Sequence, residues 1–177
     1  MNRTRIATLI LLIALTALFR IIPHPYNFTP ITAIALFGGA HFAKKRDAFL
    51  VTFLCMFISD LAIGFHSSML AVYACFAFIV LLGSNLRNTK GMVRLWTASL
   101  SGSIIFFVVT NFSVWAFENM YAKTWAGFVE CYIAALPFFQ STVLGDLFFA
   151  TLLFGSFELL SLRFRSLKES GSFAFAK

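Results

Sequence analysis

The sequence predicts an all-α integral membrane protein, a bundle of six transmembrane helices with both termini in the cytoplasm. Three observations predict this fold: the composition, six apolar segments and the placement of the basic residues. Of the 177 residues, 60% are hydrophobic and only 12% are charged, and the mean hydropathy is +0.87. A soluble domain carries about twice that share of charged residues. The composition therefore favours a chain that lies in a membrane.

Six apolar segments are separated by short polar or charged stretches. Most of them are long enough to cross, or nearly cross, a hydrocarbon core about 30 Å thick. The segments are residues 6–22, 31–43, 48–65, 67–82, 95–117 and 142–162. We expect a single six-helix domain over residues 1–167. Residues 168–177 have the Ser and Gly content of a disordered cytoplasmic tail.

The basic residues predict the orientation of the bundle. Twelve of the fourteen Lys and Arg residues lie before the first segment, in the second and fourth gaps, or after the sixth segment. The opposite side holds only Arg20 and Lys123, together with Glu118 and Glu130. Because cytoplasmic loops carry the excess of Lys and Arg, the protein is predicted to be a multi-pass protein of the cell inner (cytoplasmic) membrane. The net charge of +7 follows from this topology, and we expect no nucleic acid partner.

The second segment, residues 31–43, is short for a span. Its thirteen residues cover only about 20 Å as a helix, so we expect Thr29 to cap it and Pro30 to begin it, or neighbouring helices to shelter it. Small residues recur in it at four-residue intervals, at Ala35, Gly39 and Ala43. Such a row lets another helix approach closely. Packing inside the bundle is favoured over contact with a partner subunit.

The outward stretch 118–141 is too long for a turn and too apolar for a solvated loop. Residues 125–136, ended by Pro137, predict an interfacial or re-entrant helix over the outer mouth. Aromatic residues typical of headgroup level accompany it, namely Trp115, Tyr121, Trp125 and Tyr132.

Polar residues inside the spans carry the functional signal. Counted along the helices, Asp60, Asn111 and Asp146 lie at one level, about 7 to 9 Å below the outer surface. Ionisable groups inside a membrane are costly and mark a site or a pathway when they face the bundle interior. The expected substrate-binding residues are Arg20, His24, Asn27, Asp60, His66, Asn111, Trp115, Gln140 and Asp146.

A structural alternative explains the same residues. Arg20 would pair with Asp60 or Asp146 and lock the bundle, since a buried charge requires a partner. Function is favoured because the cytoplasmic halves of the spans hold only Glu158 and His41, both near enough to the inner face to reach solvent. A proton relay needs ionisable groups across the whole membrane, and none continues from this level toward the cytoplasmic face. A proton-driven pump is therefore less favoured.

The sequence predicts no enzyme, no bound cofactor and no metal site. It contains no G-x-x-x-x-G-K phosphate loop and no nucleophile elbow. The outer histidines have no metal-binding spacing. Cys55 and Cys75 are expected to fill helix interfaces.

Several motifs resemble a family of uncharacterised bacterial inner-membrane proteins. The resemblance covers nearly the whole chain and is carried by residues 20–40, Ser59-Asp60, Gly64-Phe65-His66-Ser67, Thr110-Asn111-Phe112, Ala134-Ala135-Leu136-Pro137-Phe138-Phe139 and Gly145-Asp146-Leu147. That family is similar in size and layout to the substrate-binding S components of energy-coupling-factor (ECF) vitamin transporters, including solitary cobalamin-type members.

The resemblance implies a protein that captures a small cofactor or vitamin-like molecule beneath its outer loops, with His24, Asp60 and Asp146 in the pocket. It also implies ATPase-driven partner subunits. The Ala-xxx-Ala docking row of S components is missing from the first span. Cys75 is the nearest candidate for a cobalt ligand if the molecule is a corrinoid, and Asn2 replaces the histidine of nickel and cobalt members.

The sequence thus predicts a membrane-embedded solute-binding subunit for uptake of a small molecule. Two alternatives remain. A membrane enzyme acting on a lipid at the outer face would use Asp60 and Asp146 as a pair. An assembly or interaction protein would use the row of small residues in the second segment.

Overall fold

Helices make up most of the structure, a computed structural model that describes residues 2–65 and 67–168. The elements are α1 (Arg3–Ala17), η1 (Leu18–Arg20), α2 (Ile31–His41), α3 (Lys45–Ile63), α4 (Met69–Ser84), α5 (Met92–Phe117), α6 (Trp125–Arg163) and η2 (Arg165–Leu167). The all-α class and the six helices are confirmed. His66 and the predicted tail beyond Lys168 lie outside the described residues.

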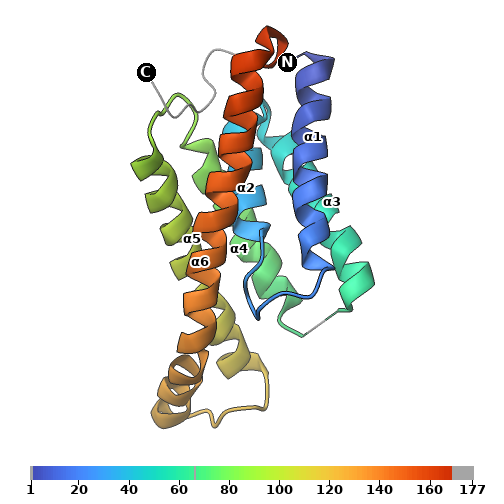
Figure 1. Cartoon of the computed structure of the whole chain (residues 1–177). Coiled ribbons are helices and arrows are strands. Elements are labelled where there is room, and N and C mark those ends of the chain that lie inside the picture. Colours follow the sequence, from blue (N-terminus) through green and yellow to red (C-terminus); the bar gives the residue numbers. More distant parts are fainter. Residues whose placement is uncertain (1, 66, 169–177) are drawn as a thin grey trace.

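The short helix α2 lies at the centre of the bundle. It contacts all five other α-helices, and all eleven of its residues are buried. The prediction that neighbours shelter this segment is therefore confirmed. The predicted cap is wrong, because Pro30 is the N-cap residue and no side chain caps the helix. The free ends of α1 and α6 lie together at one end of the bundle (Figure 1), and we call the opposite end the outer end.

Two glycines bring the backbones of α2 and α4 into contact. A Cβ atom on Gly39 would lie 2.1 Å from the carbonyl oxygen of Val80, and one on Gly83 would lie 2.4 Å from that of Leu36. Any side chain at either position would force the two helices apart. The predicted close approach therefore occurs inside the bundle, where α4 covers the small-residue face at Gly39.

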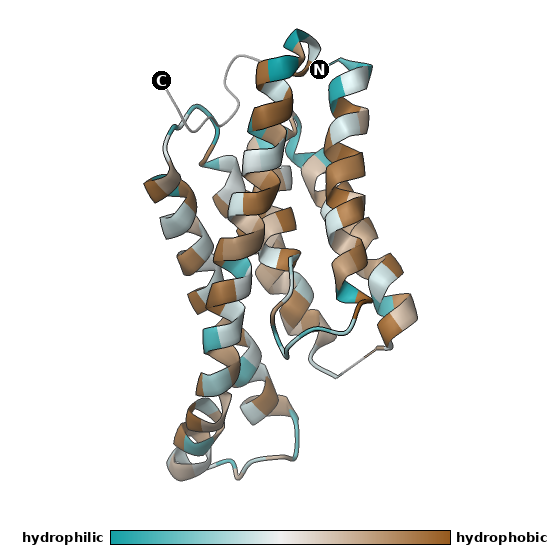
Figure 2. Ribbon diagram, viewed as in Figure 1, coloured by the Kyte–Doolittle hydropathy of each residue, from teal (hydrophilic) through white to brown (hydrophobic). Residues whose placement is uncertain are grey.

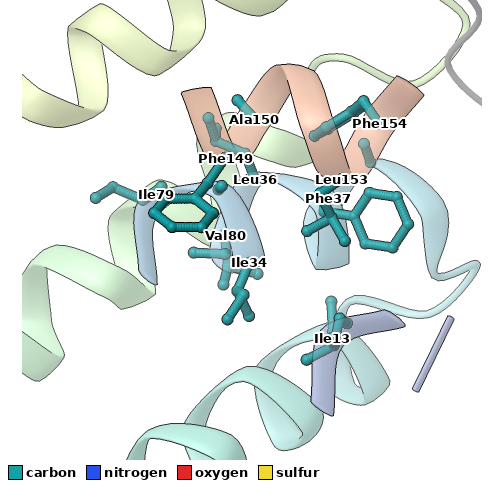
Figure 3. Close-up of a cluster of buried hydrophobic side chains, with 14 of the residues drawn as sticks. Ile13, Ile34, Leu36, Phe37, Ile79, Val80, Phe149, Ala150, Leu153 and Phe154 are labelled. Carbon is teal, nitrogen blue, oxygen red and sulfur yellow. The ribbon is translucent and has the colours of Figure 1, made fainter. Parts of the chain in front are cut away.

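The apolar core surrounds α2. Figure 3 shows side chains from α1, α2, α4 and α6 meeting there, among them Ile13, Phe37, Ile79 and Phe154. The rings of Phe37 and Phe154 meet edge to face, with their centroids 5.2 Å apart. These contacts pack α2 against α6 within the core.

Hydrophobic residues predominate along the helices (Figure 2), and many of their large apolar side chains are exposed. Exposed examples are Leu11, Leu15, Leu50, Leu54, Ile58, Leu61, Leu100, Ile104, Leu144, Phe148 and Leu152. Soluble monomers rarely expose contiguous apolar surface on this scale. By length and composition, α5 and α6 could each cross a membrane, while α2 and α4 are shorter apolar helices.

The helix α6 corrects one prediction. Residues 125–136 form no separate interfacial helix. They are the first part of α6, which passes through Pro137 without a break and is 39 residues long, about 58 Å at helical rise. Proline inside a helix removes one backbone hydrogen bond and kinks the helix without having to end it. The first half of α6 and the end of α5 therefore project beyond the other loops at the outer end (Figure 1).

A polar cluster lies at the inner end of the bundle, where α1 begins and α6 ends. Arg5 donates to the carbonyl of His41 at 3.4 Å, and Arg87 donates to the carbonyls of Phe42 and Ala43 at 3.0 and 2.8 Å. Both cations thus bind carbonyl groups at or just beyond the negative, C-terminal end of α2. His41 is only 2% exposed. The expectation that His41 reaches solvent is therefore wrong, and polar burial is not confined to the outer half.

The glycine contact yields a stability prediction. Gly39→Ala should destabilise the protein by about 1–3 kcal/mol, because the new methyl group meets helix backbone that cannot rotate away. Gly38→Ala is the matched control in the same helix, where the nearest atom is the Thr52 side-chain hydroxyl at 3.1 Å. Thermal unfolding in mild detergent, followed by tryptophan fluorescence, compares them. Equal melting temperatures for both variants would contradict the account of the α2–α4 contact.

Candidate functional site

Asp60, one of the two carboxylates predicted inside the spans, forms an ion pair. Asp60 on α3 lies 2.9 Å from the guanidinium of Arg20, and the side chains are 7% and 13% exposed. Tyr73 on α4 donates to the other carboxylate oxygen at 2.8 Å. Arg20 also donates to the hydroxyl of Ser59. The charges of Arg20 and Asp60 therefore cancel within one tight cluster that joins η1, α3 and α4.

The second carboxylate is held by hydroxyl groups. Asp146, near the middle of α6 and only 2% exposed, accepts a hydrogen bond of 2.6 Å from Ser103 of α5. Thr32, in the first turn of α2, also hydrogen-bonds its side chain. The preceding residue, Gly145, lies so close to the backbone of Phe28 that a Cβ atom there would be 3.1 Å from the Phe28 Cα. The loop between η1 and α2 thus packs directly over this part of α6.

A cavity of about 150 Å³ opens beside Asp146. It lies where η1, the following loop and four helices converge. Its lining residues are Arg20, Asn27, Thr29, Ile31, Thr32, Val72, Phe76, Phe106, Thr142 and Asp146. Asn27 adopts a left-handed backbone conformation with φ of 60°, which asparagine tolerates better than most residues and which turns the loop above the cavity.

Two further hollows lie between this cavity and the outer end, and neighbouring hollows share lining residues. A cavity of about 90 Å³ shares Asn27, Phe106 and Thr142 with the first. An outer vestibule of about 390 Å³ then shares Asn111 and two other residues with the second cavity. Ser67, from the loop between α3 and α4, lines the vestibule. The three hollows form one series from the outer loops to Asp146.

The structure brings together four of the predicted site residues. Arg20, Asn27 and Asp146 line the first cavity, and Asn27 and Asn111 line the second. Asp60 lines neither cavity, and its contact with the site is the ion pair with Arg20.

Three other predicted residues, His24, Trp115 and Gln140, lie apart from the two cavities. His24 contacts the ring of Phe19 and bonds the carbonyl oxygen of Ile22. Trp115 donates to the carbonyl of Ala122 in the α5–α6 hairpin. Gln140 is exposed, and His66 is outside the described residues.

The predicted common depth of the three polar residues is not found. Asp146 contacts Ser103, which precedes Asn111 by eight residues in α5, or about 12 Å at helical rise. Asn111 therefore lies well outward of Asp146. The estimate failed because it counted depth from Gln140 as the start of a span, whereas α6 begins fifteen residues earlier at Trp125.

Sequence reasoning missed the hydroxyl residues of the site, Thr29, Thr32, Thr142 and Ser103. One signal was available, because Thr142 precedes Asp146 by four residues and so shares its helix face. The contributions of Thr32 and Ser103 depend on how three helices pack and leave no local trace.

Cys75 is buried in the core at 2% exposure and lines none of these hollows. Its neighbours Val72 and Phe76 present their side chains to the first cavity instead. Among the described residues no group of three or more His, Cys, Asp and Glu side chains could hold a metal ion.

The two carboxylates should respond differently to the same isosteric change. Asp60→Asn should lower stability by on the order of 3 kcal/mol, because it leaves Arg20 without a counter-charge in a buried setting. Asp146→Asn should cost much less, since an amide oxygen still accepts the hydrogen bond of Ser103. Melting temperatures in detergent measure both. A larger loss for Asp146→Asn would reverse the assignment of the two roles.

No curated protein and no solved structure shows a significant match to this chain. The profile of one protein family does match, and it covers residues 1–167, from α1 to η2. The chain belongs to this family, a family of unknown function (DUF6580).

Proposed function

We propose that the protein is a membrane-embedded solute-binding subunit that takes up a small polar molecule from the outer face. The observation that carries the proposal is the series of hollows from the outer loops to the buried carboxylate Asp146. A carboxylate, hydroxyl groups and aromatic rings around one small cavity are typical of a ligand site.

A position in the membrane is supported by the apolar side chains that cover the helices and by the length of α5 and α6. The basic residues near the inner end support a cytoplasmic location for both termini. Six spans are part of the proposal. The shorter helices α2 and α4 would cross with the help of their neighbours, which supply polar partners where α2 ends.

The volume of the cavities supports a small ligand. The first two hollows measure about 150 and 90 Å³, whereas sites for drug-sized molecules measure about 300–1,000 Å³. A corrinoid would not fit unless the loop over the cavity moved. The role of Cys75 as a cobalt ligand is therefore disfavoured, and a compact solute is favoured over a large cofactor.

An energising partner belongs to the proposal as well. The chain has no phosphate loop of its own, so ATP-driven uptake would require separate ATPase subunits. The resemblance to S components of ECF transporters rests on the size and layout of the sequence. A partner surface for those subunits would lie at the inner end, where Arg5 and Arg87 hold the end of α2.

The two alternative functions have less support. A lipid-modifying enzyme would use Asp60 and Asp146 as a pair, yet Asp60 is held by Arg20 and Tyr73 and lies outside the cavity. An assembly protein would need the small-residue face of α2, which α4 covers at Gly39.

A retained ligand would test the proposal. The full chain, purified in mild detergent, should carry a small polar molecule that mass spectrometry detects in the native protein and in its heat-released extract. Asp146→Asn should lose the molecule, whereas the control Gln140→Ala, at an exposed position outside both cavities, should keep it. Repeated wild-type preparations that release nothing, and that no metabolite in a screen stabilises, would contradict uptake by this site.

Topology can be tested separately in intact cells. In a background without Cys55, Cys75 and Cys131, single cysteines at Lys45 and Lys90 should be shielded from an impermeant thiol reagent. A cysteine at Asn119, exposed in the outer loop between α5 and α6, should react. Labelling at Lys45 in sealed cells would invert the proposed orientation.

A further inference from the structure

The cavity beside Asp146 has an unbalanced charge. Two charged side chains line it, Arg20 and Asp146. The guanidinium of Arg20 is already neutralised by Asp60 at 2.9 Å and also donates to Ser59. When Asp146 is ionised, the described lining residues together with Asp60 therefore carry one net negative charge. A positive partner stabilises a charge of this kind, which is otherwise costly within a bundle.

Asp146 also has capacity for further donors. A carboxylate has room for about four hydrogen bonds. The described residues supply two donors, the hydroxyls of Ser103 and Thr32. Neither hydroxyl brings a charge, so the carboxylate is oriented but not neutralised. The side of Asp146 that lines the cavity is where a cationic guest would complete the set.

Two aromatic rings line the same cavity. Phe76 of α4 and Phe106 of α5 are in contact, with ring centroids 5.7 Å apart. The face of an aromatic ring attracts a cation, and the attraction strengthens where water is excluded. Rings of this kind suit an alkylated ammonium group, because its carbon atoms contact the rings while its charge faces the carboxylate. An inorganic cation would instead need a shell of oxygen ligands.

We propose that this cavity binds a small organic ammonium compound, with its charge on Asp146 and its alkyl groups against Phe76 and Phe106. The inference rests on the proposed function and specifies the chemical class of its solute. A cavity of about 150 Å³ limits the charged portion to a few heavy atoms. The adjoining hollow of about 90 Å³, lined by Thr110 and Asn111, accommodates a short polar extension.

Thermal unfolding of the detergent-purified full chain tests this specificity. The probes are ammonium, methylammonium, tetramethylammonium, choline, ethanolamine and putrescine, as chlorides at constant ionic strength in phosphate buffer. The neutral comparison compounds are 3,3-dimethyl-1-butanol, which has the shape of choline without the charge, and ethylene glycol. At least one alkylammonium probe should raise the melting temperature by about 2 °C or more at saturation, with no shift for its neutral counterpart.

Variants assign the effect to the site. Asp146→Asn should abolish the shift, whereas Glu158→Gln should retain it, because Glu158 is a carboxylate on the same helix that lines neither cavity. Phe106→Leu should weaken binding at least several-fold for tetramethylammonium and less for ammonium, since only the alkylated ion contacts the ring faces.

The failure of this inference is distinguishable from failure of the proposed function. Stabilisation by neutral compounds alone, lost in Asp146→Asn, would overturn the cation while leaving solute binding intact. A neutral or anionic molecule that co-purifies with the wild-type chain would do the same. Stabilisation by sodium or potassium chloride but by no ammonium compound would make the cavity an inorganic cation site and overturn the inference. No shift with any amine would overturn it as well.

Discussion

The packing of this protein depends on one short helix, α2, that is completely buried. All eleven residues of α2 are buried, and its backbone touches that of α4 where Gly39 and Gly83 carry no side chain. Because α2 contacts every other α-helix, its position fixes theirs. Its first turn brings Thr32 to the cavity, and its last turn is held by Arg5 and Arg87. The outer site and the inner basic cluster are thus the two ends of one buried element.

Apolar side chains lie on the outside of this bundle as well as in its core. Large apolar side chains cover the outside, while Asp60, Asp146 and several hydroxyls lie between the helices. Each buried acid is met by donors on neighbouring helices, Tyr73 for Asp60 and Ser103 for Asp146. Hydrogen bonds of this kind hold helices together where the surroundings are as apolar as the side chains. Polar contacts here therefore contribute both to cohesion and to the site.

Asp60 and Asp146 nevertheless differ in the partners that bind them. Asp60 is matched by the full charge of Arg20, and the ion pair joins η1 to α3. Asp146 is matched only by hydroxyls, and it faces a cavity that leads outward. The ion pair of Asp60 holds η1 and α3 together, whereas the carboxylate of Asp146 is accessible from the cavity. This contrast, more than the presence of buried acids, separates the structural part of the polar layer from the candidate binding part.

The sequence by itself determined the all-α class, the placement of the start of α1 and the end of α6 at one end of the bundle, and Asp146 as a buried polar residue. These features follow from hydropathy and charge read locally along the chain. Tertiary structure alone decided that α2 is central, that α6 runs unbroken through Pro137 and that Asp60 and Asp146 belong to separate clusters. In helices that are apolar on every side, residue periodicity does not reveal which face turns inward. Packing makes that choice, through backbone contacts such as Gly39 on Val80 that no local pattern encodes.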